Sequence, residues 1–231
     1  MSEKFGGAES YSLSPGVRYD EGVWYANAYL PILFQTRNSM ARVGQMTVPA
    51  GSSGMGSGGM SNHMGTSGGG MSGGIRPALG DLYWNGGYRI FAEEDILPAV
   101  WLTAQTKAPT AMSGFGTGAW DFGGGAGLKK TFGSFLSFLD LAYLVTGTAY
   151  RDPLIYGFGA GPVLGDGLWS ILLYYQGSTP VLDGLAGQSQ LSAGANLRTS
   201  EDFFLSATVA RGFSDSVPEM SAAAGASVYL R

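Results

Sequence analysis

Charged side chains are scarce in this chain of 231 residues, because Asp, Glu, Lys and Arg together make up only 13% of it. Soluble domains usually contain roughly 25% of these residues. The net charge is −4, which argues against a nucleic-acid partner. No apolar run approaches the ~18 residues that mark a transmembrane helix. The composition therefore fits neither an ordinary soluble domain nor a helical membrane protein.

Cysteine is absent, and histidine occurs once, as His63. The lack of cysteine excludes disulfides, thiolate metal sites and cysteine nucleophiles, and is compatible with an oxidising compartment. A single histidine nearly excludes a histidine-based catalytic site. The serine residues have no plausible base, and the acidic residues gather in expected turns. We therefore predict that the protein is not an enzyme.

Glycine (39 residues) and aromatic residues (13%) are plentiful, and the segment 80–110 shows how they are arranged. Apolar and polar residues alternate through GDLYWNGGYRI and again through ILPAVWLTAQTK, with FAEED between them. Side chains alternate between the two faces of a strand, so each half predicts a strand with one apolar and one polar face. Each is close to the roughly 9–11 residues that cross a bilayer at a tilt. The segment predicts a β-hairpin.

The same alternation recurs along the chain and predicts eleven strands. Besides the two in 80–110, strands are expected at 10–19, 23–35, 119–130, 134–146, 154–164, 168–176, 188–198, 203–212 and 220–230. Pro31 would be awkward in a central strand unless a bulge accommodates it. Single-chain bacterial barrels have even strand numbers, and an open edge is not viable in lipid. We therefore expect about twelve strands, with the first one missing or abbreviated, since residues 1–9 are too few for a full strand.

The connections between the strands alternate in length. Those at 20–22, 92–95, 132–133, 165–167 and 199–202 are short, and those at 39–79, 109–118, 147–153, 178–187 and 213–219 are longer. Outer-membrane barrels have short periplasmic turns and longer external loops, which predicts a periplasmic C-terminus. The start, MSEKFGG, shows no signal peptide. An exported barrel needs one, so we expect that it was removed or that the chain starts at a different point.

Alternation alone does not decide which face points inward, because a soluble barrel would place its apolar face inside. Three features favour a bilayer: aromatic residues near both ends of the expected strands, a polar face rich in Gly, Ser and Gln, and the alternating ending GASVYL. We predict one all-β domain over 1–231, a transmembrane antiparallel up-and-down β-barrel in a Gram-negative outer membrane. Its expected partner is the lipid bilayer, and the sequence predicts no oligomeric state.

Four short motifs resemble those of one protein family. They are Ala78-Leu79-Gly80-Asp81-Leu82 with Tyr88-Arg89, Lys107-Ala108-Pro109-Thr110, Gly116-Thr117-Gly118 with Asp121, and Gly212-Phe213-Ser214-Asp215 with Pro218. On these motifs the chain is similar to the meta-pathway of phenol degradation family of outer-membrane proteins. The resemblance implies a β-barrel transporter of small solutes, hydrophobic or aromatic ones among them. It implies no catalytic residues.

Charged residues on the expected polar face form the candidate lumen and selectivity site. Arg18, Arg89, Lys129, Arg198 and Arg231 are expected near the short turns, Asp81, Asp121 and Lys107 near the loops, and Asp140 in mid-strand. A basic ring at a pore mouth would favour anions. Alternatively, acidic residues of the short turns neutralise it, since charges in a low-dielectric setting tend to pair.

A long Gly/Ser/Met-rich external loop is expected at 39–79. It contains Met55, Met60, His63, Met64 and Met71. Thioether sulfur is a soft ligand that suits Cu(I), so the loop is a candidate copper site. Alternatively, these methionines are incidental in a low-complexity segment. No other cofactor is predicted.

Two functions fit these observations: a porin-like channel for passive passage of small solutes, or a closed structural or binding barrel whose Met-rich loop binds copper or a partner. The inward side chains discriminate between them, because a barrel of this size is narrow. Small residues would leave a passage at Gly87, Gly123, Gly125, Gly127, Gly157, Gly159 and Gly194. Large residues would plug it at Tyr25, Tyr29, Trp101 and Phe138.

Overall fold

The computed structural model describes residues 2–5, 8–35, 40–43, 46–49, 76–112, 115–147, 150–217 and 219–230. All regular structure in these residues is β-strand. They include no helix of the length and apolar character needed to cross a membrane. Fifteen strands form one sheet, and β6 (Met40–Val43) and β7 (Met46–Pro49) form a separate hairpin. The predicted all-β fold class is confirmed.

Nine long strands form the larger part of the sheet, and each pairs antiparallel with the next. They are β9 (Leu82–Phe91), β10 (Ala99–Ala108), β11 (Asp121–Phe132), β12 (Phe135–Thr146), β13 (Leu154–Leu164), β14 (Trp169–Ser178), β15 (Ser189–Arg198), β16 (Phe203–Gly212) and β17 (Met220–Leu230). The predicted bounds of β13, β16 and β17 are confirmed. Alternation located these strands well because each one has a single apolar face.

The earlier strands are interrupted, two of them at prolines. β2 (Ala8–Leu13) and β3 (Gly16–Asp20) flank Pro15, β4 (Trp24–Tyr29) and β5 (Ile32–Gln35) flank Pro31, and β8 (Arg76–Leu79) precedes β9. Proline has no N–H to donate to a ladder, but its carbonyl still accepts. The Leu30 amide donates to the Pro15 carbonyl at 3.0 Å, and the Gly80 amide donates to the Pro31 carbonyl at 2.8 Å. The single strands predicted at 10–19 and 23–35 are therefore each divided at a proline, and hydrogen bonding continues across the breaks.

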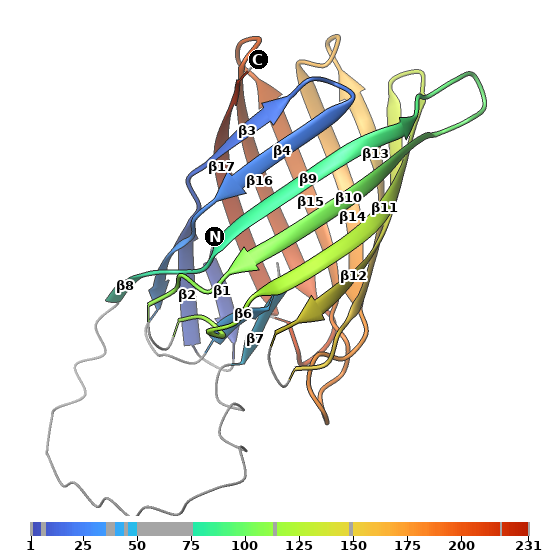
Figure 1. The fold of residues 1–231 in the computed structure, drawn as a ribbon. Coiled ribbons are helices and arrows are strands. Elements are labelled where there is room, and N and C mark those ends of the chain that lie inside the picture. The colour runs from blue at the N-terminus through green and yellow to red at the C-terminus, as the bar shows by residue number, and fades with distance from the viewer. Residues whose placement is uncertain are drawn as a thin grey trace, which may run out of the picture.

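β17 has hydrogen-bonded neighbours on both sides. β17 pairs antiparallel with β16 on one side. On its other side it pairs antiparallel with β1 (Ser2–Phe5) at Ser221 and Ala222, and in parallel with β3 at Tyr229 and Leu230. β1 also pairs with β2 and is four residues long. Figure 1 shows the sheet curving round, with β9–β12 facing β13–β16 across its interior.

The two faces of the curved sheet differ in chemistry. On β12, Phe135, Leu139, Leu141, Tyr143 and Val145 point outward, and each is between 47% and 50% exposed. The residues of the other phase point inward, and among them Leu144 is only 1% exposed. Each of the other long strands except β15 also has at least one large apolar side chain that is exposed. Soluble monomers rarely expose so many large apolar side chains on one face.

The expected loop at 39–79 is shorter than predicted. Residues 40–43 and 46–49 pair as a hairpin. Residues 76–79 form β8 and pair with β5, which extends the line of β9 beyond Gly80 and Asp81. Composition identified the Gly/Ser/Met-rich stretch, but it missed this non-local pairing at its end. Residues 50–75 lie outside the described part of the chain.

Candidate functional site

A cavity of about 460 Å³ lies on the inner face, next to the short turn between β3 and β4. Residues from β3, β4, β9, β10, β11 and β12 line it, so the curvature of the sheet creates this space. Its charged lining consists of Arg18, Asp20, Arg89, Lys129 and Asp140, and its aromatic lining consists of Tyr25, Trp101 and Phe138. The structure thus brings four of the predicted site residues to one place: Arg18, Arg89, Lys129 and Asp140.

The basic side chains at this end differ in their partners. Arg18 forms an ion pair with Asp20 at 2.8 Å, and its guanidinium lies 4.4 Å from the centre of the Tyr25 ring. The Arg89 guanidinium lies 5.8 Å from the centre of the Trp101 ring. Arg198 does not line the cavity and donates to the Asp166 carbonyl at 3.3 Å. Among the described members of the predicted basic ring, Arg18 is therefore the one that forms an ion pair with a carboxylate. Arg231 lies outside the described residues.

The acidic turn after β9 is bound to the neighbouring hairpin. Glu93 accepts the Thr131 amide at 2.7 Å and lies 3.4 Å from the Lys130 ammonium group, which also donates to two carbonyls of the same turn. The backbone hydrogen bond from Thr131 lowers the pKa of Glu93, assisted by Lys130. Glu93 is therefore charged at neutral pH and pairs with Lys130, which is not a member of the predicted ring.

Aromatic rings cover several of the inward glycines. A Cβ atom added to Gly87, Gly157 or Gly159 would lie less than 3.0 Å from the ring of Tyr25, Tyr174 or Phe138 respectively. The Tyr25 and Trp101 rings are 5.8 Å apart, and those of Phe138 and Tyr174 are 5.4 Å apart. The Gln105 side chain covers Gly123 in the same way. At these positions glycine provides room for a neighbouring side chain and does not leave an open passage.

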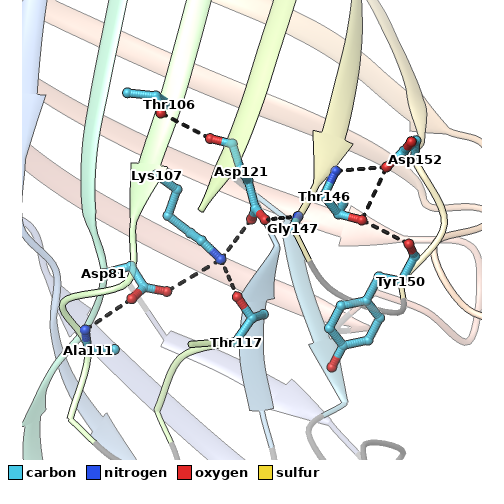
Figure 2. A network of polar contacts seen from close by, with 10 residues as sticks. All are labelled: Asp81, Thr106, Lys107, Ala111, Thr117, Asp121, Thr146, Gly147, Tyr150 and Asp152. Atoms are coloured by element: carbon cyan, nitrogen blue, oxygen red, sulfur yellow. Dashed lines mark hydrogen bonds and ion pairs between the residues drawn. The ribbon is translucent and has the colours of Figure 1, made fainter. Parts of the chain in front are cut away.

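A buried ion cluster lies at the opposite end of the inner face, where the longer loops begin (Figure 2). The Lys107 ammonium group is 2.7 Å from Asp121 and 3.5 Å from Asp81, and none of the three side chains is more than 1% exposed. Lys107 and Asp121 are direct cross-strand partners on β10 and β11, whereas Asp81 comes just before β9. These three residues were expected near the loops, and the register of the strands brings them together.

The ion cluster also holds the first turns of two loops. Asp81 accepts the Ala111 amide at 3.0 Å, and Asp121 accepts the Gly147 amide at 3.2 Å. The Lys107 ammonium group donates to the Thr117 hydroxyl. Figure 2 shows these contacts converging from β10, β11 and the loops that follow β10 and β12. Hydrogen bonds from the loop backbones help to satisfy the carboxylates, as buried charges require.

Three of the four motifs that stand out in the sequence meet in this cluster. GDL supplies Asp81, KAPT supplies Lys107 and Thr110, and GTG with the following Asp supplies Thr117 and Asp121. The Thr110 hydroxyl accepts the Leu82 amide at 2.9 Å and so joins the first two motifs directly. The sequence showed each motif alone but not their contact.

Sequence reasoning missed Tyr174 as an occupant of the interior, whereas the alternation placed Gln105 on the polar face of its strand. Tyr174 lies on the inward phase of β14, so the alternation contained the signal that would have placed it on the inner face. It contained no signal for the glycine that each side chain covers, because that depends on the neighbouring strand.

The candidate copper ligands Met55, Met60, His63, Met64 and Met71 all lie outside the described residues. Within the described ranges, no group of three or more His, Cys, Asp or Glu side chains could hold a metal ion. Cu(I) binding by the loop stays a prediction.

Comparison with protein-family models and with curated proteins finds no match to this chain. The resemblance to the meta-pathway of phenol degradation family therefore stays a prediction that depends on the motifs alone.

Proposed function

We propose that this chain is a transmembrane antiparallel β-barrel of about twelve strands in a bacterial outer membrane. The observation that carries the proposal is the reversed polarity of the sheet. Apolar side chains such as Leu139, Leu141 and Ile171 are about half exposed, while Asp81, Lys107 and Asp121 are buried on the other face. Large exposed apolar surfaces mark contact with lipid or with other proteins. Because the apolar band surrounds an interior that contains polar groups, as in outer-membrane barrels, contact with lipid is favoured over contact with another protein.

The contacts of β17 support closure of the barrel. Strands in a bilayer must satisfy their backbone groups internally, so a membrane sheet cannot keep a free edge. β17 has partners on both sides, with β16 on one and β1 and β3 on the other. The short β1 and the two parallel residue pairs with β3 form a seam, and this seam is where a twelve-stranded barrel would contain its abbreviated strand.

We further propose that the barrel passes small solutes passively, hydrophobic or aromatic ones among them. The polar inner face and the cavity beside Arg18 and Arg89 support a route through the barrel. The motif resemblance supports the proposed class of solute. Two constrictions lie on that route: the rings of Tyr25, Trp101, Phe138 and Tyr174, and the ion cluster with its loops. Passage therefore requires side chains or loops to move, so the route is gated. No catalytic activity is proposed.

Single-channel conductance of the full chain, refolded into planar bilayers, tests this proposal. We expect the wild-type protein to insert and to conduct weakly, because both constrictions are in place. Tyr25→Ala/Trp101→Ala removes one of the two ring pairs and Lys107→Ala removes the centre of the ion cluster, and the triple variant is expected to conduct more than either. Trp84→Ala/Trp120→Ala is the matched control, because both indoles are exposed on the outer face. A control that conducts as well as the triple variant would contradict the route.

A closed structural or binding barrel is the second candidate, and the glycines covered by aromatic rings favour it. The same experiment separates the two candidates. Insertion without conductance in any variant would favour the closed barrel. Failure to insert, in a protein that has β-sheet circular dichroism, would overturn the membrane proposal itself.

A further inference from the structure

We propose that the cavity beside the β3–β4 turn is a binding site for a small organic anion that has one negative charge and a compact apolar body. The inference deepens the proposed function, because it names the class of solute that would occupy the route at this point. It depends on three features of the cavity: basic groups without carboxylate partners, an aromatic wall and a small excess of positive charge.

Two basic side chains face the cavity without an ion-pair partner among the described residues. Arg18 has its carboxylate in Asp20 at 2.8 Å. Arg89 on β9 and Lys129 on β11 also line the cavity, but neither forms an ion pair with another described side chain. Each of these groups can bind the carboxylate of a ligand in this space, and hydrogen bonds between charged partners are the stronger ones.

Aromatic rings lie directly beside these basic groups. Trp101 on β10 lies between the strands that carry Arg89 and Lys129, and its ring is 5.8 Å from the Arg89 guanidinium. The rings of Tyr25 and Phe138 complete an apolar wall. A ligand held by its carboxylate at Arg89 would therefore place its body against Trp101. The volume of about 460 Å³ is in the range of small-molecule sites, roughly 300–1,000 Å³.

Asp140 limits the charge of the ligand. It lines the same cavity from β12 and forms no ion pair with a described residue. Three basic and two acidic side chains line the cavity, so its net charge is +1. This balance favours a monoanion over an uncharged molecule and disfavours a dianion. It also predicts that Asp140 and Arg89 have opposite effects on the affinity, which a purely structural role would not produce.

Titration calorimetry of the refolded full chain in detergent tests the site without requiring passage. The probes are cyclohexanecarboxylate and its uncharged amide, which have the same apolar body, and micelles without protein provide the blank. We expect the carboxylate to bind about tenfold more tightly than the amide, since one charged hydrogen-bond partner is gained. Arg89→Gln is expected to remove most of this preference, and Asp140→Asn is expected to increase the affinity for the carboxylate severalfold. Arg198→Gln, a basic residue outside the cavity lining, leaves both affinities unchanged.

Equal binding of the carboxylate and the amide would overturn the proposal, and so would an Arg198→Gln effect as large as that of Arg89→Gln. Each variant is first shown to be folded by circular dichroism and by its compact migration in unheated gels. Anion binding without conductance would leave the site in place and reject the open route. Conductance without charge-selective binding would reject the site and keep the route.

Discussion

Two adjacent glycines of β11 differ in how closely the neighbouring strands approach them. Gly125 points inward, and a Cβ atom there would lie 2.8 Å from the Ala142 methyl group and closer still to the Leu141 carbonyl. Gly124 points outward, and its nearest neighbour would be the Thr103 carbonyl at 3.8 Å, an ordinary contact. The inner glycine is thus required by the close approach of β12, whereas the outer one is not required by packing.

Gly125→Ala is therefore expected to destabilise the fold by about 1–3 kcal/mol, the usual cost of overpacking. Gly124→Ala, its matched control, is expected to be neutral or to stabilise by up to ~1 kcal/mol, because alanine reduces the entropy of the unfolded chain. Urea unfolding in lipid vesicles, followed by tryptophan fluorescence, measures both variants. Equal losses would show that packing against β12 is not the reason for Gly125.

The ion cluster at the loop end connects whole elements. Lys107 at the end of β10 contacts Asp121 at the start of β11 and Asp81 before β9, and these carboxylates hold the backbones of two loops. Removing one member of a buried ion pair leaves an uncompensated charge, which costs far more than losing an exposed pair. The cluster therefore fixes the loops to the ends of the strands.

Lys107→Ala is expected to lower the free energy of unfolding by about 3–5 kcal/mol and to make the loop after β10 sensitive to protease. Adding Asp81→Asn and Asp121→Asn is expected to restore most of the stability, because the buried negative charges are then absent. Lys130→Ala serves as the control, since Lys130 contacts the partly exposed Glu93 in a turn, and a much smaller loss is expected. A Lys130→Ala loss equal to that of Lys107→Ala, or no recovery in the triple variant, would contradict this role.

Large apolar side chains from every long strand except β15 are exposed on the outer surface of the molecule. In water such a surface promotes aggregation, whereas in a bilayer it is the stable arrangement. The inner face contains polar side chains as well as aromatic ones. Gln176 and Gln190, for example, are joined by a hydrogen bond of 3.2 Å between β14 and β15. Adding a charge to the outer face should therefore cost more stability than adding one to the inner face.

Leu141→Arg, an outward change near the middle of β12, is expected to cost about 2–4 kcal/mol of stability in a lipid bilayer. Gln190→Arg, an inward change on β15, is expected to cost much less, because its charge remains next to polar groups. Unfolding in vesicles of two bilayer thicknesses provides the measurement, and the cost of Leu141→Arg should follow the depth of the side chain in the bilayer. Equal costs for both variants would contradict a lipid-facing outer surface.

Local pattern was sufficient to find the nine long strands, β9 to β17, but it missed β1, β6, β7 and β8. Alternation has a period of two residues and requires only neighbours in the chain, so β13, β16 and β17 were predicted with their observed bounds. An irregularity at Pro31 was predictable for the same reason, since a missing N–H is a property of one residue, but the strand is divided there and does not continue through a bulge. The membrane, the solute route and the copper site remain predictions from that pattern.

Tertiary structure decided which residues meet. The register between strands places Lys107 opposite Asp121 and seats the Tyr25 ring over Gly87. Neither pairing follows from alternation, because a shift of one strand by two residues would keep every face and change every partner. Contacts between residues distant in the chain also decided that β8 extends the line of β9 and that β1 lies between β17 and β2. Faces are set by neighbours along the chain, whereas partners are set by how the strands align and curve.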